Sequence, residues 1–436
     1  MHKKQKILFI PSIILFSFTF LLFAFIGLKP IFIYTITFIS SSLLFISISR
    51  EIIKYELPLK YVYILLGLSF ILRFAFIPVN PIGSDDYYRY IWDGKVQAYG
   101  INPYKYAPAD TALNSLHTDK LPKLINFPDM KTIYPPLSQI IFYFSYLIGG
   151  ESFIGIKIFL LLSDIISLWG IFIVLKKLKL PYKNILIYAL CSLPIFQFFI
   201  DAHLDGFGLP LFIFTIYFYL NKQKLLSLIF LSASICIKPL GLILIPIFFF
   251  NEKEFKDKIK VVAVPALLCL LMYLPYLFTG SPFQALMNFT ENWTFNGIIF
   301  NILDLFFKDN QRTRLICGII FIIMYLPVIL SRKDLITKIY LSIFLLFIFS
   351  PVVHPWYLTW LAVLLPFIPR WSGILYVGLI SLTSFTILNY QLNGIWKEYT
   401  PVLILEYIPV LLFFGFELYG LWKENFKNLK IQNLNN

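Results

Sequence analysis

The sequence is 436 residues long, and 59% of them are hydrophobic, 19% aromatic and only 14% charged. Its mean hydropathy of +0.78 excludes a soluble globular domain, because such a chain would expose a large apolar surface to water. The formal net charge of +14 comes mainly from basic residues in short connectors, such as Lys176, Lys177, Arg332 and Lys333. This distribution follows the positive-inside rule of membrane proteins, and it excludes a nucleic-acid-binding face.

Apolar runs long enough to cross about 30 Å of hydrocarbon recur along the whole chain. They predict an all-α, polytopic integral membrane protein that forms one domain over residues 1–436. An even number of spans places both termini in the cytoplasm, where the basic residues at both ends favour them. The first run lacks a small-x-small cleavage motif, so we expect it to be a retained helix rather than a signal peptide. The expected spans, about fourteen in all, are 7–28, 31–49, 61–79, 153–175, 185–200, 205–220, 225–237, 239–250, 259–279, 313–331, 336–353, 357–369, 372–390 and 402–422.

Two hydrophilic segments interrupt these runs. Residues 80–133 are expected to form a large extracytoplasmic loop that begins with a surface helix over 84–99, and residues 280–312 a second extracytoplasmic loop. The apolar run 134–149 is predicted to lie at the outer surface or to re-enter it, because a full span would move Lys176 and Lys177 outside.

Four cysteines lie inside apolar runs without CxxC spacing. This placement predicts small core residues rather than a disulfide framework or a metal site. The four are Cys191, Cys236, Cys269 and Cys317.

Six polar segments fall on the same, extracytoplasmic side when the basic residues alone set the orientation. This agreement predicts one site built from several helix ends. The segments begin at Ser84, Tyr134, Asp201, Lys238, Asn292 and Val353.

The pair Asp85 and Asp86 is the first candidate for chemistry, because carboxylates beside a bilayer are costly to keep ionised. One reading is that a carboxylate acts as the general base that takes a proton from an attacking hydroxyl. The other is that Ser84 and the two aspartates cap the surface helix. Both can hold, since adjacent helical residues point about 100° apart and only one carboxylate would face a cavity.

Three basic residues could neutralise a phosphate leaving group: Arg89, Lys105 and Lys238. Lys238 is of most interest because it precedes Pro239, which breaks the apolar run. The alternative for Lys238 is a lysine that extends to the membrane surface from a helix end.

The remaining candidates carry open alternatives. His354 could bind phosphate, orient the acceptor or share a proton, or could be a structural hydrogen-bonding residue. Trp356 and Tyr357 suit a substrate site or an interfacial aromatic belt. Asp201, His203 and Asp205 have spacing that allows a metal site, although polar lining of a cavity explains them as well. Tyr134, with the two prolines after it, marks the rigid start of a helix. The second loop contributes two further candidates, Asn292 and Trp293.

Signals of several other chemistries are absent from the sequence. It contains no GxxxxGK[ST], GxGxxG, GxSxG or HExxH motif. Direct use of nucleotide-activated substrates is therefore not expected. No cofactor is indicated, and a divalent cation stays an open alternative.

The order of these motifs resembles that of a known family. The segments SDDYYRYIWDGKVQAYGINPYKYAP, YPPLSQIIFYFSYLIGG, DAHLDGFG, IKPLGLILIP, NWTFNG and SPVVHPWYLTW are similar to the bacterial GT-C polyprenyl-phosphate-mannose-dependent mannosyltransferases. These include the phosphatidylinositol mannoside mannosyltransferase type. A looser similarity extends to GPI mannosyltransferase I. The resemblance covers most of residues 61–369, and two helices precede the family's usual first one.

The resemblance implies a GT-C fold and an inverting transfer of one sugar, mannose, at the outer face of the plasma membrane. The donor would be a polyprenyl-phosphate sugar and the acceptor a lipid-linked or glycan molecule, with membrane lipids around both. The family's base maps onto Asp85, with Asp86 as its acidic neighbour, and the family's histidine maps onto His354. The rival functions are a lipid-glycan flippase or transporter, and a ligase whose donor is a lipid diphosphate.

Overall fold

The computed structural model describes residue 13 and residues 30–434 of the chain. In that part the protein is helical and has no β-strand; the isolated backbone pairs join Phe295 and Asn296 to Val352. The expected first span, 7–28, lies outside the described residues apart from residue 13.

Seven helical segments in the described part are long and apolar enough to cross a membrane, and a bent pair could form an eighth span. The prediction of an integral membrane protein with many spans is therefore confirmed, whereas the count of fourteen stays a prediction. The long segments are α2 (Pro30–Lys54), α3 (Leu59–Phe76), α6 (Ile154–Leu178), α12 (Phe255–Leu277), α15 (Asn310–Leu330), Trp371–Asn393 (α18, Trp371–Leu379; η6, Ile380–Thr383; α19, Ser384–Asn393) and the first part of α20 (Thr400–Leu434).

The bent pair corresponds to the expected span 185–200. Its first half holds η2 (Tyr182–Asn184) and α7 (Ile185–Ala189), and its second half holds α8 (Ser192–Pro194) and the π-helical η3 (Ile195–Ile200). The two halves meet at 44°.

Shorter apolar helices account for four of the other expected spans: α9 (Asp205–Leu220), α10 (Lys224–Ile235), η4 (Pro239–Ile243) with α11 (Leu244–Asn251), and α16 (Leu335–Phe349). Two further short apolar helices, α5 (Pro136–Gly149) and α14 (Ile298–Phe307), lie outside the expected spans.

The expected span 357–369 is not one helix. It holds only η5 (Pro355–Leu358) and α17 (Thr359–Ala362), followed by turns. Pro366 and Pro369 remove backbone donors that a longer helix would need. The segment is almost fully buried, so it forms part of the core rather than a lipid-facing helix.

The two hydrophilic segments carry helices of their own. The first loop contains α4 (Asp86–Ala98), which confirms the helix expected over 84–99, and η1 (Thr111–Leu116). The second, expected to be a loop, contains α13 (Gln284–Asn292) and α14. α5 begins with Pro136 in its first turn, a position where proline costs the helix no hydrogen bond.

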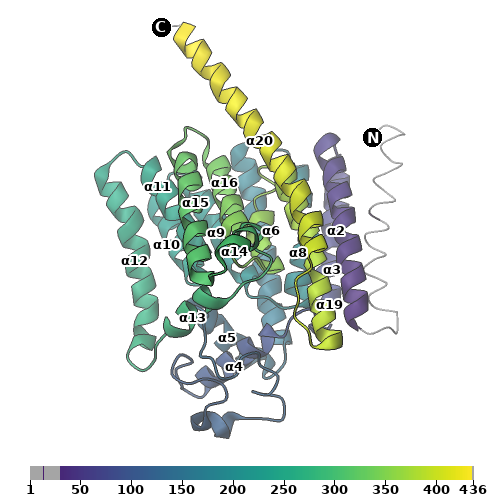
Figure 1. Cartoon of the computed structure of the whole chain (residues 1–436), viewed down its shortest axis with the longest axis vertical. Helices are drawn as coiled ribbons and strands as arrows, with labels where there is room; N and C mark the ends of the chain where they lie inside the picture. The colour runs from purple at the N-terminus through teal and green to yellow at the C-terminus, as the bar shows by residue number, and fades with distance from the viewer. Residues whose placement is uncertain (1–12, 14–29, 435–436) are drawn as a thin grey trace.

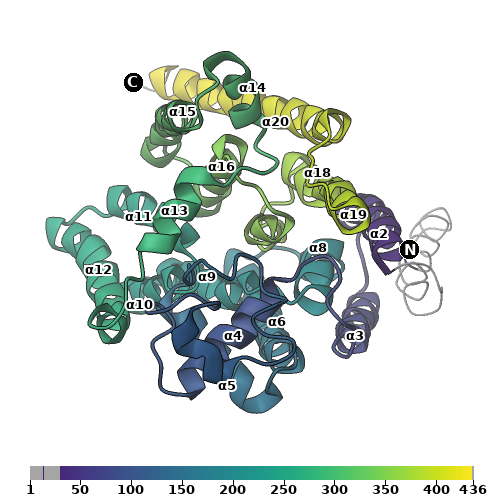
Figure 2. The ribbon, with the colours of Figure 1, turned by 60° about the horizontal axis from the view of Figure 1, so that its bottom comes forward.

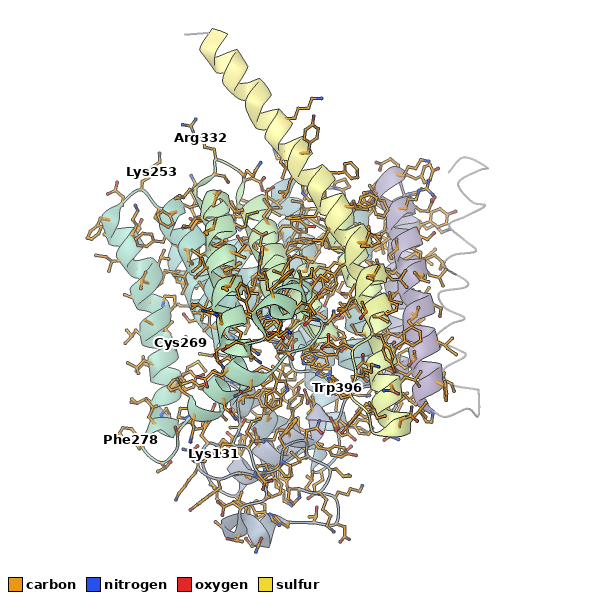
Figure 3. All side chains as sticks on the ribbon, viewed as in Figure 1. Lys131, Lys253, Cys269, Phe278, Arg332 and Trp396 are labelled. Atoms are coloured by element: carbon orange, nitrogen blue, oxygen red, sulfur yellow. The ribbon has the colours of Figure 1, made fainter. Side chains whose placement is uncertain are left out.

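The first loop and α5 gather at one end of the helix bundle, with α4 and α5 lying across it (Figures 1 and 2). α12 runs between the two ends, so that Phe278 lies near the loop end and Lys253 at the other (Figure 3). Lys131 also lies at the loop end, and Arg332 lies opposite. Leu267, Leu270 and other apolar side chains of α12 are exposed, as a lipid-facing helix requires.

Candidate active site

Connectors between helices bring the six polar segments together at the loop end of the bundle. The start of α5 is joined to the end of α10, because the backbone amides of Leu137 and Ser138 donate to the carbonyl of Cys236. The 350s connector is joined to the segment after α13, since the amide of Phe295 donates to the carbonyl of Pro351 and the amide of Val353 donates to the carbonyl of Phe295. The segments predicted to share one site are thus neighbours in space.

A partly buried ion pair forms the first part of the site. Lys238 Nζ lies 2.6 Å from Asp205 Oδ1, and Trp360 Nε1 donates to the same oxygen at 2.8 Å. Lys238 also lies over the ring of Tyr357, 3.4 Å from its centroid. The break between α10 and η4 places Lys238 at this point, since Pro239 cannot continue the helix. Lys238 is therefore held toward the helix ends rather than extended to the surface.

A stack of rings forms the second part. His203 packs on Trp356 with centroids 3.7 Å apart, Trp356 on His354 at 4.3 Å, and His354 on Phe295 at 4.7 Å. Burial lowers the pKa of His354 to about 3, with Lys238 nearby as a second cause, so the imidazole is neutral.

The two adjacent aspartates have different surroundings. Ser84 Oγ accepts from the amide of Asp86 at 3.2 Å, so the serine caps α4, whereas the Asp85 side chain does not cap. Asp85 instead accepts a hydrogen bond from Asn126. The carboxylate of Asp86 faces the ring stack, with Oδ2 3.8 Å from His203 Nδ1.

Both carboxyl groups titrate above their usual range. Burial raises the pKa of Asp85, and it raises that of Asp86 to about 7. The charge of Asp85 adds to the effect on Asp86, while Lys238 opposes it. A carboxylate with a pKa near 7 is a good proton acceptor at neutral pH.

Arg89 belongs to a buried network on α4. Its Nε donates to Asp93 at 2.8 Å and one Nη donates to the carbonyl of Met130 at 2.8 Å. Asp93 also accepts from Thr132 at 2.5 Å and from Gln139 at 2.9 Å. This network fixes the guanidinium in place and leaves its second Nη for a further acceptor.

Buried polar atoms without a partner gather in the same region. Among the described residues, both ring nitrogens of His203 and Nη2 of Arg89 are buried and make no hydrogen bond. Buried polar groups in proteins are nearly always hydrogen-bonded, so these atoms suit a polar ligand such as a sugar or a phosphate.

Other predicted residues lie in different places. Tyr134 packs edge-on against Tyr90, with ring centroids 5.1 Å apart. Trp293 packs against Phe127 of the first loop at 4.8 Å. Lys105 is exposed and lies over its neighbour Tyr106, and Asn292 is exposed and bonds to Asn288 within α13. The structure does not bring Lys105 and Asn292 to the ion pair.

Asp201 lies in the connector of His203 and Asp205, but its carboxylate is bound by Tyr34 and Gly83 rather than by a shared ligand position. In the described part of the chain, no three His, Cys, Asp or Glu side chains form a group that could hold a metal ion.

Several contributors to this region were missed from the sequence. Asn126, Asp93, Gln139 and Tyr34 all touch the candidate residues or their supports. Asp93 lies in the acidic stretch and carried a weak signal, whereas Asn126 and Tyr34 sit in segments that nothing in the sequence links to the site.

The fold and this site define a polytopic membrane protein with a carboxylate, a cation and unpaired buried polar atoms at one end. Residues 72–251 match the family model described as "Alpha-(1->6)-mannopyranosyltransferase, N-terminal domain", and residues 311–415 match the one described as "MptB C-terminal domain". The chain belongs to this mannosyltransferase family and is a glycosyltransferase. The resemblance found in the sequence is thereby confirmed. A search of curated proteins found no match to the chain.

Proposed function

We propose that this chain is a GT-C glycosyltransferase that moves one mannose from a polyprenyl-phosphate donor to a lipid-linked or glycan acceptor, with inversion, at the extracytoplasmic face of the plasma membrane. The observation that carries the proposal is the Asp86 carboxylate, 3.8 Å from His203 and at the same end of the bundle as the Lys238–Asp205 ion pair. A base and a fixed cation at helix ends suit a donor that arrives through the lipid.

The chemical step is a single displacement. The acceptor hydroxyl oxygen attacks the anomeric carbon of mannose, while the bond from that carbon to the phosphate oxygen breaks. Asp86 accepts the hydroxyl proton, and the polyprenyl phosphate leaves with the bonding electrons. Lys238 and the free Nη2 of Arg89 stabilise the charge that develops on the phosphate.

Asp86 rather than Asp85 takes the role of base in this proposal. Support comes from their partners: Asp85 accepts from Asn126, whereas Asp86 accepts no hydrogen bond from a described side chain. Asp85 then acts as the acidic neighbour that raises the proton affinity of Asp86. His203 and His354 line the site and contact the substrates as neutral groups.

The stereochemistry follows from the family and the mechanism together. The family model is described by an α-(1→6) linkage, which makes the attacking group the hydroxyl on carbon 6 of the acceptor sugar. An inverting transfer that forms an α-linkage needs a donor whose mannose is β-linked to phosphate. The donor is therefore expected to be a β-linked polyprenyl-phosphate mannose.

The test uses purified protein in lipid nanodiscs with three mannose donors: polyprenyl monophosphate, polyprenyl diphosphate and nucleotide diphosphate. Product should form from the β-linked monophosphate alone, with an α-linkage in the product. Lys238→Gln should raise the KM for the donor about tenfold, the value of one charge-assisted hydrogen bond. Lys120→Gln, which changes an exposed lysine of the first loop, is the matched control and should behave as the parent.

Three results would overturn the proposal. Transfer from the diphosphate lipid would assign the chain to the ligases, and transfer from the nucleotide sugar would exclude a lipid-phosphate donor. If a folded parent forms no product but moves the lipid-linked sugar across a sealed bilayer, the flippase function replaces it.

A further inference from the structure

A second buried carboxylate lies beneath the acidic loop, in a cluster of four residues that we call the Asp201 cluster: Tyr34, Gly83, Gln197 and Asp201. Asp201 is 1% exposed and Tyr34 is fully buried. The Tyr34 hydroxyl donates to Asp201 Oδ2 at 2.5 Å, and the backbone amide of Gly83 donates to Oδ1 at 2.7 Å. Gln197 Nε2 lies 3.5 Å from Oδ2 of Asp201. Both oxygens of Asp201 are thus occupied by fixed donors.

Gly83 comes directly before Ser84, whose side chain caps α4 at Asp86. A Cβ atom at Gly83 would lie 2.5 Å from the Tyr34 ring and 2.7 Å from Asp201 Oδ2. Only glycine at position 83 therefore allows the backbone to approach the Asp201 carboxylate this closely. The hydrogen bond fixes the chain three residues before Asp86.

The segment leading to Gly83 is held from other helices as well. Lys157 of α6, which is fully buried, donates to the carbonyl of Phe76 at 3.2 Å and also to that of Val79. Gln391 of α19 donates to the carbonyl of Ile82 at 2.5 Å. Of the four residues held in this way, Gly83 is the closest in sequence to Asp85 and Asp86, and its partner is Asp201.

Two contacts join the same two segments in parallel. Gly83 meets Asp201, and three residues later Asp86 meets His203, two residues after Asp201. Between them Ala202 has φ +61, a left-handed conformation that is unfavourable for a residue with a Cβ. Such a conformation persists only where neighbouring contacts hold it, and the hydrogen bond from the His203 amide to Gln197 O at 2.8 Å is one of them.

We propose that Asp201 and Tyr34 are positioning residues that set the Asp86 carboxylate against His203. The inference rests on the proposed function, in which Asp86 is the base. In this arrangement Tyr34 of α2 orients Asp201, and Asp201 holds the first loop at Gly83. This gives α2, one of the two helices that precede the family's usual first one, a part in the active site.

The test compares Tyr34→Phe and Asp201→Asn with the parent by steady-state kinetics and by hydrogen exchange of the segment 80–88. Displacement of a catalytic group by about 1 Å can cost up to about a hundredfold in rate. We expect kcat to fall at least about tenfold in both variants while the donor KM stays within about twofold, because Lys238 is untouched. The Gly83 amide should exchange faster in both.

The matched control is Tyr340→Phe in α16, which removes another fully buried hydroxyl, one that lies 2.7 Å from Ser372 Oγ of α18. It should lose stability as Tyr34→Phe does, with parent-like kcat and parent-like exchange at Gly83. The milder Tyr34→Phe keeps the test valid if Asp201→Asn fails to fold.

The inference is overturned if Tyr34→Phe keeps the parent kcat, or if exchange at Gly83 is unchanged in both variants. Hydrogen exchange needs no substrate, so the two proposals fail separately. A parent that transfers no sugar overturns the proposed function, whatever the exchange of Gly83.

Discussion

At the scale of single residues, the site separates two adjacent carboxyl groups by their surroundings. Asp85 is bound by Asn126, while Asp86 lies between its acidic neighbour and the Lys238–Asp205 pair. Burial and the charge of Asp85 raise the pKa of Asp86 to about 7, and Lys238 limits the rise. His354 stays neutral, since burial lowers the pKa of its imidazole to about 3.

A pH dependence follows from these values. If Asp86 is the base, it must be deprotonated, so kcat/KM should rise with pH and level off above about 7. Below that value the rate should fall about tenfold per pH unit, because the protonated carboxyl cannot accept a proton. His354 should add no second limb between about pH 5 and pH 9, because its pKa lies lower. The measurement is kcat/KM across that range; a flat profile would contradict the assignment.

The residues that could be found from the sequence are those whose chemistry is rare in an apolar chain. Lys238 before Pro239, the Asp85–Asp86 pair and His354 stand out because a charge or a histidine in such a run has few structural uses. Asn126 and Tyr34 could not be found, because an amide in a polar loop and a tyrosine in an apolar helix are ordinary. Their partners lie 41 and 167 residues away in the sequence.

At the scale of helices, close packing of α4 on α5 brings the acidic loop over the bundle. A Cβ atom at Gly94 of α4 would collide with the backbone carbonyl of Phe142 in α5. The glycine therefore allows the two helices to approach closely. The buried hydrogen bond from Gln139 of α5 to Asp93 of α4 is a second contact between the same helices.

Gly94→Ala should separate α4 from α5 and destabilise the protein by about 1–3 kcal/mol, the usual cost of overpacking a core. The neighbouring Asp86 should move with α4, so transfer activity should fall as well. The measurement is the thermal unfolding midpoint together with kcat.

Gly318→Ala in α15 is the matched control, since a Cβ atom there meets nothing within 4 Å. It should be neutral or stabilise slightly, because alanine favours a helix more than glycine does. Equal behaviour of the two variants would argue against the close α4–α5 contact.

Helices that fill a long apolar run were predictable, whereas helices inside the hydrophilic segments and the break at the 360s prolines were not. The expected span 205–220 coincides with α9, because the apolar run ends at polar residues on both sides. The expected span 357–369 fails as a helix at its prolines, and α13 and α14 were missed inside a segment that looked like a loop. Apolar composition alone does not distinguish a span from a buried core segment, which only the tertiary packing decides.

At the scale of the whole molecule, the candidate site and two of the basic connectors occupy opposite ends. The first loop with Lys131 lies at the end of the candidate site, and Lys253 and Arg332 lie at the other (Figure 3). This polarity is what the positive-inside rule predicts for an extracytoplasmic site. The proposed lipid-linked donor would then reach the site without crossing the membrane.

Sidedness can be tested with single cysteines in intact cells. A membrane-impermeant maleimide should label Lys120→Cys in the first loop but not Arg332→Cys, both of which change exposed residues. After the membrane is permeabilised, both should react. Labelling of Arg332→Cys alone in intact cells would invert the orientation and place the site in the cytoplasm.

The most direct test of the central claim is the transfer rate of Asp86→Asn beside that of Asp85→Asn, with β-linked polyprenyl-phosphate mannose as donor. Loss of a general base costs roughly 10²–10⁴ in rate, so Asp86→Asn should fall at least about a hundredfold while keeping the donor KM and the unfolding midpoint of the parent. Asp85→Asn should lose less than about tenfold, since it only tunes its neighbour. Near-parental activity of Asp86→Asn, or an inactive Asp85→Asn beside an active Asp86→Asn, would contradict the account.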